Sequence, residues 1–327
     1  MPDADQLLLG SLCTGYGGLD LACRDTLGTR TAWVAENDPH AAKVCRARFK
    51  APNLGDIKTI DWTTIQPIDV LTAGYPCQPF SHAGKRRGSD DPRHIWPYIA
   101  EGVRHLRPRL VVLENVAGHL TTGFGEVVGT LAAMGYDATW GCVRASDAGG
   151  CHQRKRVFIV AADADGAGPQ GRRGPVERPR ELVASPRDPS DHAKVKLLPT
   201  PTVNDSRGGR NITANRFAKK DTTSLGWTLS DVAFADRWGE YAEAIKRWEP
   251  IVGRSVPEPV DAKGRLSPVF VEWMMGLPAG WVTAVTNYPK VNVSGEKLAR
   301  SHMLKILGNG VVPQQATLAL HHLLPRL

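Results

Sequence analysis

The stretch LLLGSLCTGYGGLDLA, residues 7–22, joins a short apolar run to a turn rich in glycine and then to a second apolar segment. The run at 7–13 predicts a β-strand, and the segment at 19–27 predicts a helix. The glycines of TGYGG allow the chain to turn tightly between the two. A dinucleotide-binding loop would have another glycine three residues after Gly17, where this chain has Asp20, so the turn fits a phosphate cradle poorly.

The same alternation of strand and helix continues to residue 161. Further β-rich runs lie at 31–35, 70–73, 110–114 and 157–161, and helix-like stretches lie at 39–49, 94–106 and 124–134. Such alternation predicts an α/β fold with a doubly wound, mainly parallel sheet. Because ligands of such sheets bind beyond the carboxyl ends of the strands, we expect the functional residues to follow the strands.

The chain changes character after residue 161. Residues 166–190 are rich in glycine and proline and predict loop. The segment 207–220, RGGRNITANRFAKK, has five basic residues and no acidic one, and is either a solvated loop or a phosphate-contacting one. Helices are expected again near 225–248 and at 314–324.

The composition is that of a soluble globular protein. The 327 residues are 42% hydrophobic and 23% charged, with a net charge of +8 that permits a polyanionic partner without proving one. No apolar run is long enough for a membrane span, and the first residues do not resemble a signal peptide, so we expect a cytoplasmic protein. The six cysteines lack metal-ligand spacing, so we expect free thiols and no metal.

Two acidic residues follow predicted strand regions in the first part of the chain. Glu36 ends the run at 31–35 and would suit the two hydroxyls of a ribose. Asp56, in LGDI, could accept a hydrogen bond from an adenine amino group. Ribose and adenine recognition without a phosphate cradle suggests S-adenosylmethionine as cofactor; the alternative is a tight turn with two surface acids.

A thiol, a carboxyl and two guanidiniums follow or precede the other strands. Cys77 lies in GYPCQPFS between two prolines, which restrict the backbone and help to fix the direction of the sulfur. Glu114 ends the next strand, and Arg154 and Arg156 precede the strand at 157–161. Cys77 alone could be an ordinary buried thiol, but the four groups together predict a reaction site.

The sequence resembles the DNA cytosine-5 methyltransferases in the order of its motifs. CTGYGG, ENDP, GDI, GYPCQPFS, ENV, RKRVFIV, RLSPVFVEWMMGLP and LGNGVVP look like successive family motifs. Residues 163–264 lack a counterpart, and the family keeps its variable target-recognition region there. The resemblance implies a catalytic and cofactor-binding domain at 1–162, a target-recognition domain at 163–264 and a return segment at 265–327. The sequence of segments such as LLPTPT (197–202) and EWMMGLP is similar to that of phage and actinobacterial type II modification methylases.

The resemblance also implies the reaction: methyl transfer from S-adenosylmethionine to carbon 5 of a flipped-out cytosine in a specific double-stranded DNA sequence. Cys77 would add to carbon 6, because a thiolate is a strong nucleophile near neutral pH. Glu114 would hydrogen-bond N3 and the exocyclic amine, and Arg154 and Arg156 would hold the O2 side. The expected partner is DNA, with a cognate restriction endonuclease as a functional companion and a monomeric enzyme.

Further binding residues are implied by the same motifs and by the basic segments. The cofactor residues would be Cys13, Gly15, Tyr16, Gly17, Gly18, Glu36, Asn37, Asp56, Ile57, Pro76, Ile95 and Asn309. The DNA-contacting residues would be Gln78, Ser81, Lys85, Arg86, Arg87, Arg207, Arg210, Asn211 and Arg216. The segment after Cys77 is expected to close over the flipped base.

The chain departs from the family at two positions. Cys13 stands where the family has phenylalanine against the adenine, and His152 stands where it has glutamine. Three alternatives stay open. A transfer RNA cytosine-5 methyltransferase of the same fold usually lacks a long recognition region, and a non-catalytic DNA-binding relative usually loses the nucleophile or the carboxylate. An enzyme that methylates exocyclic amines uses an Asp/Ser/Asn-Pro-Pro-aromatic loop, which this sequence lacks.

Overall fold

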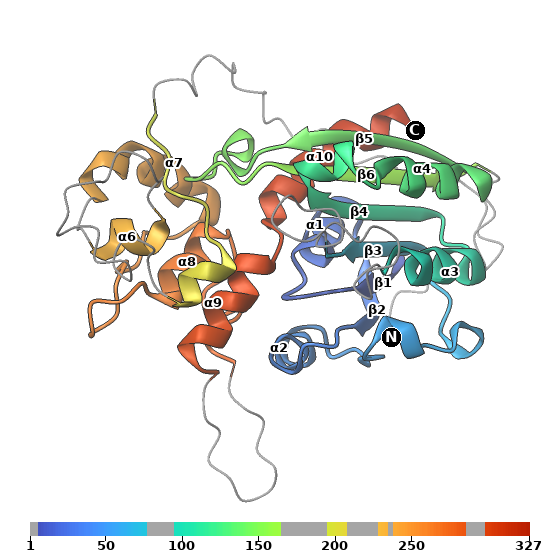
Figure 1. The fold of residues 1–327 in the computed structure, drawn as a ribbon, viewed down its shortest axis with the longest axis horizontal. Coiled ribbons are helices and arrows are strands. Elements are labelled where there is room, and N and C mark those ends of the chain that lie inside the picture. Colours follow the sequence, from blue (N-terminus) through green and yellow to red (C-terminus); the bar gives the residue numbers. More distant parts are fainter. Residues whose placement is uncertain (1–5, 77–94, 165–194, 208–227, 235–237, 286–297) are drawn as a thin grey trace, which may run out of the picture. The chain divides into compact units, whose positions relative to one another are not determined.

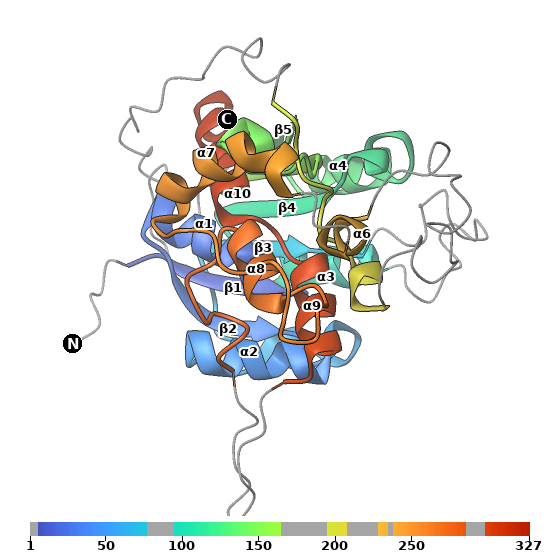
Figure 2. The ribbon, with the colours of Figure 1, turned by 90° about the vertical axis from the view of Figure 1, so that its left-hand side faces the viewer.

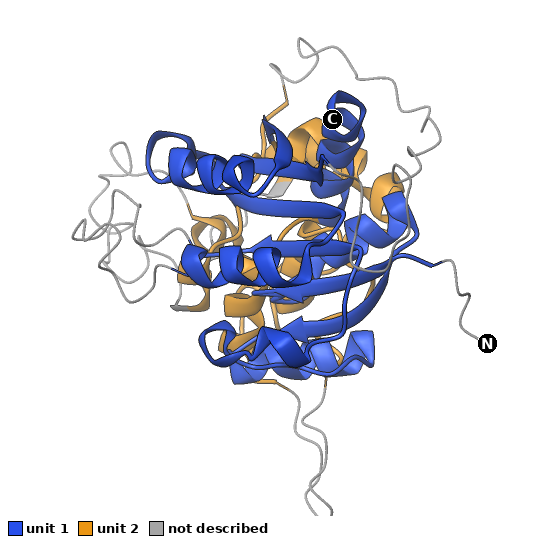
Figure 3. Ribbon diagram, turned by 90° about the vertical axis from the view of Figure 1, so that its right-hand side faces the viewer, with its two compact units in different colours: residues 1–143, 155–183, 313–327 blue, residues 144–154, 184–312 orange. Residues whose placement is uncertain are grey.

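The computed structural model describes residues 6–76, 95–164, 195–207, 228–234, 238–285 and 298–327. The chain divides into two compact units (Figure 3). Unit 1 contains residues 1–143, 155–183 and 313–327, and unit 2 contains residues 144–154 and 184–312. Each unit is described by itself below. Among the described residues, no helix is both long and apolar enough to cross a membrane.

Unit 1 is built on a six-stranded sheet in the order β2-β1-β3-β4-β6-β5 (Figure 1). β1 pairs in parallel with β2 and β3, β3 pairs in parallel with β4, and β6 runs antiparallel to both β4 and β5. The bounds are β1 Leu8–Leu12, β2 Arg30–Ala35, β3 Val70–Gly74, β4 Leu110–Val116, β5 Tyr136–Val143 and β6 Arg156–Asp163. The predicted α/β fold with a mainly parallel sheet is confirmed.

The helices of unit 1 lie close to their predicted positions. They are α1 Gly18–Leu27, α2 Pro39–Phe49, α3 Trp96–Leu106, α4 Phe124–Ala133 and α10 Pro313–Leu323. α2 begins at Pro39 because Asp38 caps it, accepting hydrogen bonds from the N–H groups of His40 and Ala41. α10 packs against α1 and against β5, where Gln315 donates a hydrogen bond to the carbonyl of Val143.

The central strands of unit 1 are buried on both faces. Val70, Leu71 and Ala73 of β3 are 0% exposed, as are Val111 and Val112 of β4. Successive side chains of a strand point to opposite faces, so these runs bury apolar groups under helices on both sides of the sheet. That explains why these strand sequences are mostly apolar rather than alternating between apolar and polar residues.

Unit 2 contains only helices and short 3-10 segments among its described elements. They are η6 Ala145–Ala148, η8 Val203–Arg207, α6 Leu229–Phe234, η10 Trp238–Tyr241, α7 Ala242–Val252, α8 Pro268–Met274 and α9 Arg300–Asn309. α8 and α9 lie side by side (Figure 2). The predicted helix at 225–248 is therefore two separate helices, α6 and α7, with α7 extending past the predicted end.

The core of unit 2 is held by a buried carboxylate and two tryptophans. Glu272 in α8 is 0% exposed and accepts hydrogen bonds from the N–H groups of Gly280, Val282 and Thr283 and from the Thr283 hydroxyl. Trp248 donates to the carbonyl of Trp273 at 3.0 Å. These bonds tie α8 to the loop that follows it and α7 to α8.

The two units divide the chain differently from the predicted boundaries at residues 162 and 265. α8 and α9 belong to unit 2, and the chain returns to unit 1 at Pro313. Before the predicted boundary at residue 162, residues 144–154 also belong to unit 2. Hydrogen bonds explain this division physically, because Arg154 binds the carbonyls of Gly308 and Gly310 and His152 binds the carbonyl of Met274.

Candidate active site

Four strand ends of unit 1 meet at one edge of the sheet. Because β1, β2, β3 and β4 run in parallel, their carboxyl ends point the same way. Cys13 follows β1, Glu36 follows β2, Tyr75 follows β3, and Glu114 lies near the end of β4. We call this the carboxyl edge. These four residues therefore lie at one edge of the sheet, where the sequence analysis expected functional residues.

The glycine turn connects β1 to α1 through backbone geometry that other residues rarely adopt. Gly15 has φ +60° and Gly17 has φ +82°. A Cβ atom on Gly17 would lie 2.1 Å from Cζ of Phe49. Asp20 of α1 accepts a hydrogen bond from the hydroxyl of Ser11 at 2.8 Å and is 3% exposed. This aspartate therefore ties the helix back to β1, where a phosphate-binding loop would have a glycine.

Glu36 has a carboxylate oriented by two backbone donors. Oε2 accepts a hydrogen bond from the N–H of Gly15 and Oε1 accepts one from the N–H of Asp38, each at 2.8 Å. The main chain of Glu36 is in turn held by the side-chain amide of Asn53. Burial raises the pKa of Glu36, which is only half-buried by area. The bonds leave a fixed, partly accessible carboxylate, which suits a diol.

Cys13 lies near both acids proposed for the adenosine side. Its backbone has φ +50°, and its N–H donates to the carbonyl of Ala35 at 2.9 Å. Burial, with the charges of Glu36 and Asp56, raises the pKa of the thiol to about 12. Asp56 also caps the segment η1 (Ile57–Thr59) by accepting a hydrogen bond from Lys58. The thiol therefore stays neutral beside two carboxyl groups.

The other predicted cofactor residues differ in exposure. Tyr16 is 0% exposed, Ile57 is 7% and Ile95 is 9%, so these side chains are packed in unit 1. Pro76 and Asn37 are exposed, and Gly18 is the first residue of α1. Asn309 is exposed at the end of α9 in unit 2, and is described within that unit alone.

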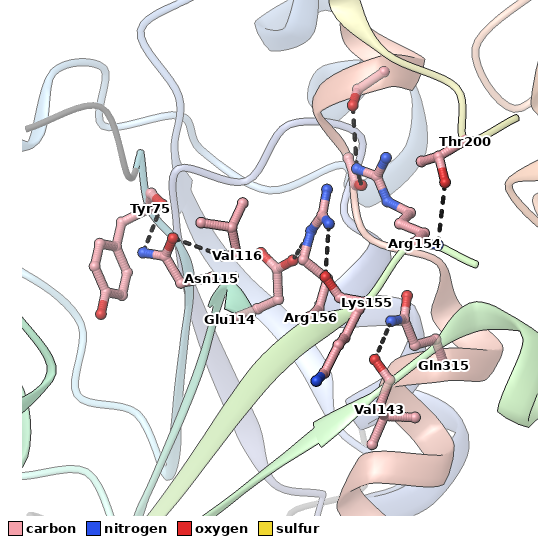
Figure 4. A network of polar contacts seen from close by, with 12 residues as sticks. Tyr75, Glu114, Asn115, Val116, Val143, Arg154, Lys155, Arg156, Thr200 and Gln315 are labelled. Carbon is pink, nitrogen blue, oxygen red and sulfur yellow. Dashed lines mark hydrogen bonds and ion pairs between the residues drawn. The ribbon is translucent and has the colours of Figure 1, made fainter. Parts of the chain in front are cut away.

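Glu114 and Arg156 form an ion pair across neighbouring strands of unit 1 (Figure 4). The Nε atom of Arg156 lies 2.9 Å from Oε1 of Glu114, and the two side chains are 18% and 9% exposed. The structure therefore brings together two of the four residues predicted to be catalytic.

Arg154 has different partners from Arg156. It belongs to unit 2, is 3% exposed, and donates hydrogen bonds to the carbonyls of Pro201, Gly308 and Gly310. Its own N–H donates to the hydroxyl of Thr200 (Figure 4). These contacts favour a structural role for Arg154 in unit 2, while the predicted contact with the O2 side of a base stays a prediction.

Sequence reasoning missed three residues that hold the end of β3. Asn115 is 3% exposed and donates a hydrogen bond to the carbonyl of Tyr75 at 3.3 Å (Figure 4). The hydroxyl of Tyr75 lies 2.8 Å from Nε2 of His119. The ENV motif pointed only to its glutamate, and no local signal marks a tyrosine and a histidine 44 positions apart as partners.

Several predicted residues lie outside the described part of the chain. These are Cys77, Gln78, Ser81, Lys85, Arg86, Arg87, Arg210, Asn211 and Arg216. Arg207 is the last residue of η8. His152, the departure from the family pattern, is 0% exposed, and its Nε2 lies 3.1 Å from the carbonyl of Met274, so it packs inside unit 2.

Sequence comparisons show that the chain is similar to known methylases. A model of the family described as C-5 cytosine-specific DNA methylase matches residues 8–257. The chain is 34% identical over 157 residues to the type II methyltransferase M1.ScrFI of Lactococcus lactis subsp. cremoris, covering 46% of the chain and 40% of the relative. It is 36% identical over 154 residues to M.NgoBI of Neisseria gonorrhoeae, covering 46% and 48%. The chain thus spans less than half the length of these relatives.

Solved structures agree with the fold. A Spodoptera frugiperda DNMT2 mutant matches with a TM-score of 0.57 and 17% identity, covering 97% of this chain and 100% of that one. The S. pombe Dnmt2 methyltransferase matches with a TM-score of 0.56 and 16% identity, covering 96% and 98%. At these identities the likeness supports the fold alone.

Proposed function

The chain belongs to the C-5 cytosine-specific DNA methylases, and from this premise we propose that it transfers a methyl group to carbon 5 of cytosine in double-stranded DNA. The observation that carries the proposal is the 2.9 Å ion pair between Glu114 of β4 and Arg156 of β6, in which β4 lies next to β3, the strand that leads to Cys77. Gly74 of β3 is in register with Glu114, so the nucleophile segment begins beside the carboxylate.

Cys77 acts as the nucleophile of the proposed reaction. Carbon 5 of cytosine is a poor nucleophile until a thiolate adds to carbon 6 and makes the ring enamine-like. Carbon 5 then gains the methyl group and loses its proton to a base. The electrons of that C–H bond re-form the ring double bond and expel the Cys77 thiolate, which restores the enzyme.

Glu114 stabilises the ring while Cys77 is attached. Addition at carbon 6 places negative charge on the ring, and a carboxyl group that shares a proton with N3 relieves it. Arg156 holds one oxygen of that carboxyl group, Oε1, by its Nε atom. We expect the other oxygen to face the base, with the rest of the Arg156 guanidinium toward O2.

S-adenosylmethionine would supply an electrophilic methyl group. The residues at the carboxyl edge fit its adenosine part: Glu36 presents a carboxylate with two oxygens fixed by backbone donors, and Asp56 lies near Cys13. The neutral Cys13 thiol in place of a phenylalanine leaves a smaller group beside the adenine position. These residues bind and orient the cofactor and perform no bond making.

The substrate must leave the double helix to be methylated. Carbon 5 and carbon 6 are not accessible to a thiol inside a stacked duplex, so the base is flipped out at a cost of a few kcal/mol. The region 163–264 then chooses the sequence, as in type II modification, where a restriction endonuclease is the functional companion. The alternative substrate, transfer RNA, would use the same carboxyl edge.

Radioactive methyl transfer to duplex DNA and to transfer RNA, measured side by side, tests this proposal. We expect label in DNA, at carbon 5 of cytosine after hydrolysis, and none with Cys77→Ser. Duplex DNA with 5-fluorocytosine at the target should form a denaturant-resistant complex, because carbon 5 cannot lose fluorine as a cation in the way it loses a proton, so Cys77 is not expelled. Cys142→Ser is the matched control, since Cys142 is an exposed thiol of β5.

Two results would contradict the proposal. Label in transfer RNA but not in DNA would favour the RNA enzyme. Near-normal turnover by Cys77→Ser would exclude a covalent mechanism at that residue. Bisulfite sequencing of DNA from cells that express the protein would then identify the sequence that is methylated.

A further inference from the structure

The chain leaves β3 toward Cys77 through Tyr75, which is held at two separate points. Its backbone carbonyl accepts a hydrogen bond from the side chain of Asn115 at 3.3 Å, and its hydroxyl lies 2.8 Å from Nε2 of His119. Tyr75 is 5% exposed, Asn115 3% and His119 1%. A residue fixed at both its main chain and the far end of its side chain has little freedom to rotate.

Both partners of Tyr75 lie just after Glu114 in the sequence. Asn115 is the next residue of β4, and His119 lies in the short segment η5, Ala117–Thr121. The same stretch therefore supplies the proposed carboxylate and both contacts that fix the start of the Cys77 segment. A shift of Tyr75 relative to Glu114 would require both hydrogen bonds to change.

Aromatic packing surrounds the Tyr75–His119 pair. The Tyr75 ring lies 6.1 Å from the ring of Trp96, and the His119 ring contacts Tyr75 and Phe124 edge-on at 5.6 and 6.4 Å. Burial lowers the pKa of His119 and raises that of Tyr75, so both groups are neutral near pH 7. A neutral hydrogen bond in an apolar surrounding is costly to leave unmade.

We propose that Tyr75 is a positioning residue: through Asn115 and His119 it fixes the direction in which the chain leaves β3 and so places Cys77 relative to Glu114. This inference rests on the proposed function, because Cys77 must attack a base that Glu114 holds. It assigns to Tyr75 and His119 a role in the rate of addition and none in binding. A small displacement of a nucleophile lowers the rate strongly, by up to about 100-fold for 1 Å.

The chain offers a matched control for removing the hydroxyl. Tyr136 is also buried, at 3% exposure, and its hydroxyl donates to the carbonyl of Pro108 at 2.7 Å. It begins β5 opposite Asp163 at the end of β6, which places it at the edge of the sheet away from Glu114. Tyr75→Phe and Tyr136→Phe each remove one buried, hydrogen-bonded hydroxyl, so Tm measured for both variants shows how much of any loss is due to stability.

The experiment measures kcat, and the rate at which 5-fluorocytosine DNA becomes covalently attached, in the full chain with saturating DNA and cofactor. We expect Tyr75→Phe to lower both by about tenfold, with Kd for DNA and cofactor within about twofold of the original. Tyr136→Phe should leave both rates unchanged. His119→Phe should match Tyr75→Phe, and His119→Gln, which keeps a polar atom near the position of Nε2, should restore most of the rate.

The double variant separates one shared contact from two independent effects. If the hydroxyl and the imidazole act through their mutual bond, Tyr75→Phe combined with His119→Phe should be no slower than either alone. Full kcat in Tyr75→Phe, or an equal loss in Tyr136→Phe, would overturn the positioning role while leaving the methylase function intact. Absence of transfer and of covalent complex in the unmodified protein would overturn both.

Discussion

The Nε atom of Arg156 and the Oε1 atom of Glu114 lie 2.9 Å apart although the two residues are not direct partners in the sheet. Arg156 is in register with Val116, and Glu114 with Phe158. The pair is therefore diagonal, between residues two positions apart on neighbouring antiparallel strands, which long side chains can span. A guanidinium that holds one carboxylate oxygen orients the other, so the activity of Glu114 should depend on Arg156.

Replacing Arg156 with lysine should lower kcat about tenfold or more, because an ammonium group lacks the planar fork that aligns a carboxylate. The KM for cofactor should change little, since Arg156 begins β6 and Glu36 follows β2, with three strands between them in the sheet order. Steady-state methyl transfer measures both quantities. Arg24→Lys is the control, because Arg24 and Asp25 form an exposed pair with side chains 55% and 52% accessible. Unchanged kcat in Arg156→Lys would remove Arg156 from the reaction.

Arg154 should affect stability more than chemistry. Its guanidinium binds three carbonyl groups from two segments of unit 2, and a lysine could not reach all of them. Arg154→Lys should lower the free energy of unfolding by about 2–4 kcal/mol, the cost of buried carbonyls left without a charged donor. Urea denaturation measures this change, with the exposed Arg265→Lys, paired to Asp261, as control. Normal stability with lost activity would instead support the predicted contact with the base.

The central strands β3 and β4 could be predicted because they are buried on both faces and are therefore rich in apolar residues. β5 was not predicted, since Tyr136–Val143 contains glycine, aspartate and threonine and is an outer strand with several exposed residues. The ENV motif identified Glu114, but the partners of Asn115 and His119 depend on packing between β4 and the end of β3. Arg154 and Arg156 look equivalent in the sequence RKR, and only tertiary contacts distinguish them.

Asp20 should make stability depend on pH. Burial raises its pKa from 3.8 to about 6, so between these values the folded state binds more protons than the unfolded one. The contribution of Asp20 is therefore fully present below about pH 4 and is lost as pH rises through about 6. Asp20→Asn should remove this loss. The difference in free energy of unfolding between the variant and the original should grow by about 2–3 kcal/mol from pH 4 to pH 7.

Urea denaturation at a series of pH values gives that difference directly, because the other titrating groups are common to both proteins. Asp25→Asn is the control, since Asp25 is exposed in the same helix. A difference that stays constant from pH 4 to pH 7 would mean that Asp20 is ionised equally in the folded and unfolded chains.

Glu272 should be essential for the packing of unit 2. Four donors converge on its buried carboxylate, three of them backbone N–H groups. Glu272→Gln keeps the shape but turns an amide N–H₂ toward donors, leaving about two of them without an acceptor. We expect a loss of about 3 kcal/mol or more in the free energy of unfolding. Glu243→Gln, on the exposed side of α7, should change stability by less than about 0.5 kcal/mol. A similar small change in Glu272→Gln would show that the carboxylate is not needed.

DNA recognition should depend on the basic run at 207–220. The described segments on either side of residues 208–227 are joined by Asp205, whose carboxylate accepts hydrogen bonds from Thr202 and Ser230. The described residues that flank 208–227 are thus held together in unit 2. Five basic residues and no acidic one in 207–220 would attract phosphates, so affinity for DNA should fall steeply as salt rises.

Single alanine substitutions at four positions should produce variants of two classes. The positions are Arg207, Arg210, Asn211 and Arg216. A residue that contacts phosphate should weaken binding to all sequences alike and reduce the salt slope by about 1. A residue that reads a base should relax the choice of site at one position, at about 1–3 kcal/mol of discrimination. Genome-wide mapping of methylated cytosines, together with binding at several salt concentrations, distinguishes the classes. Lys246→Ala, an exposed cation of α7 outside the run, is the control and should change neither quantity. If all four variants behaved like Lys246→Ala, the recognition surface would lie elsewhere in the chain.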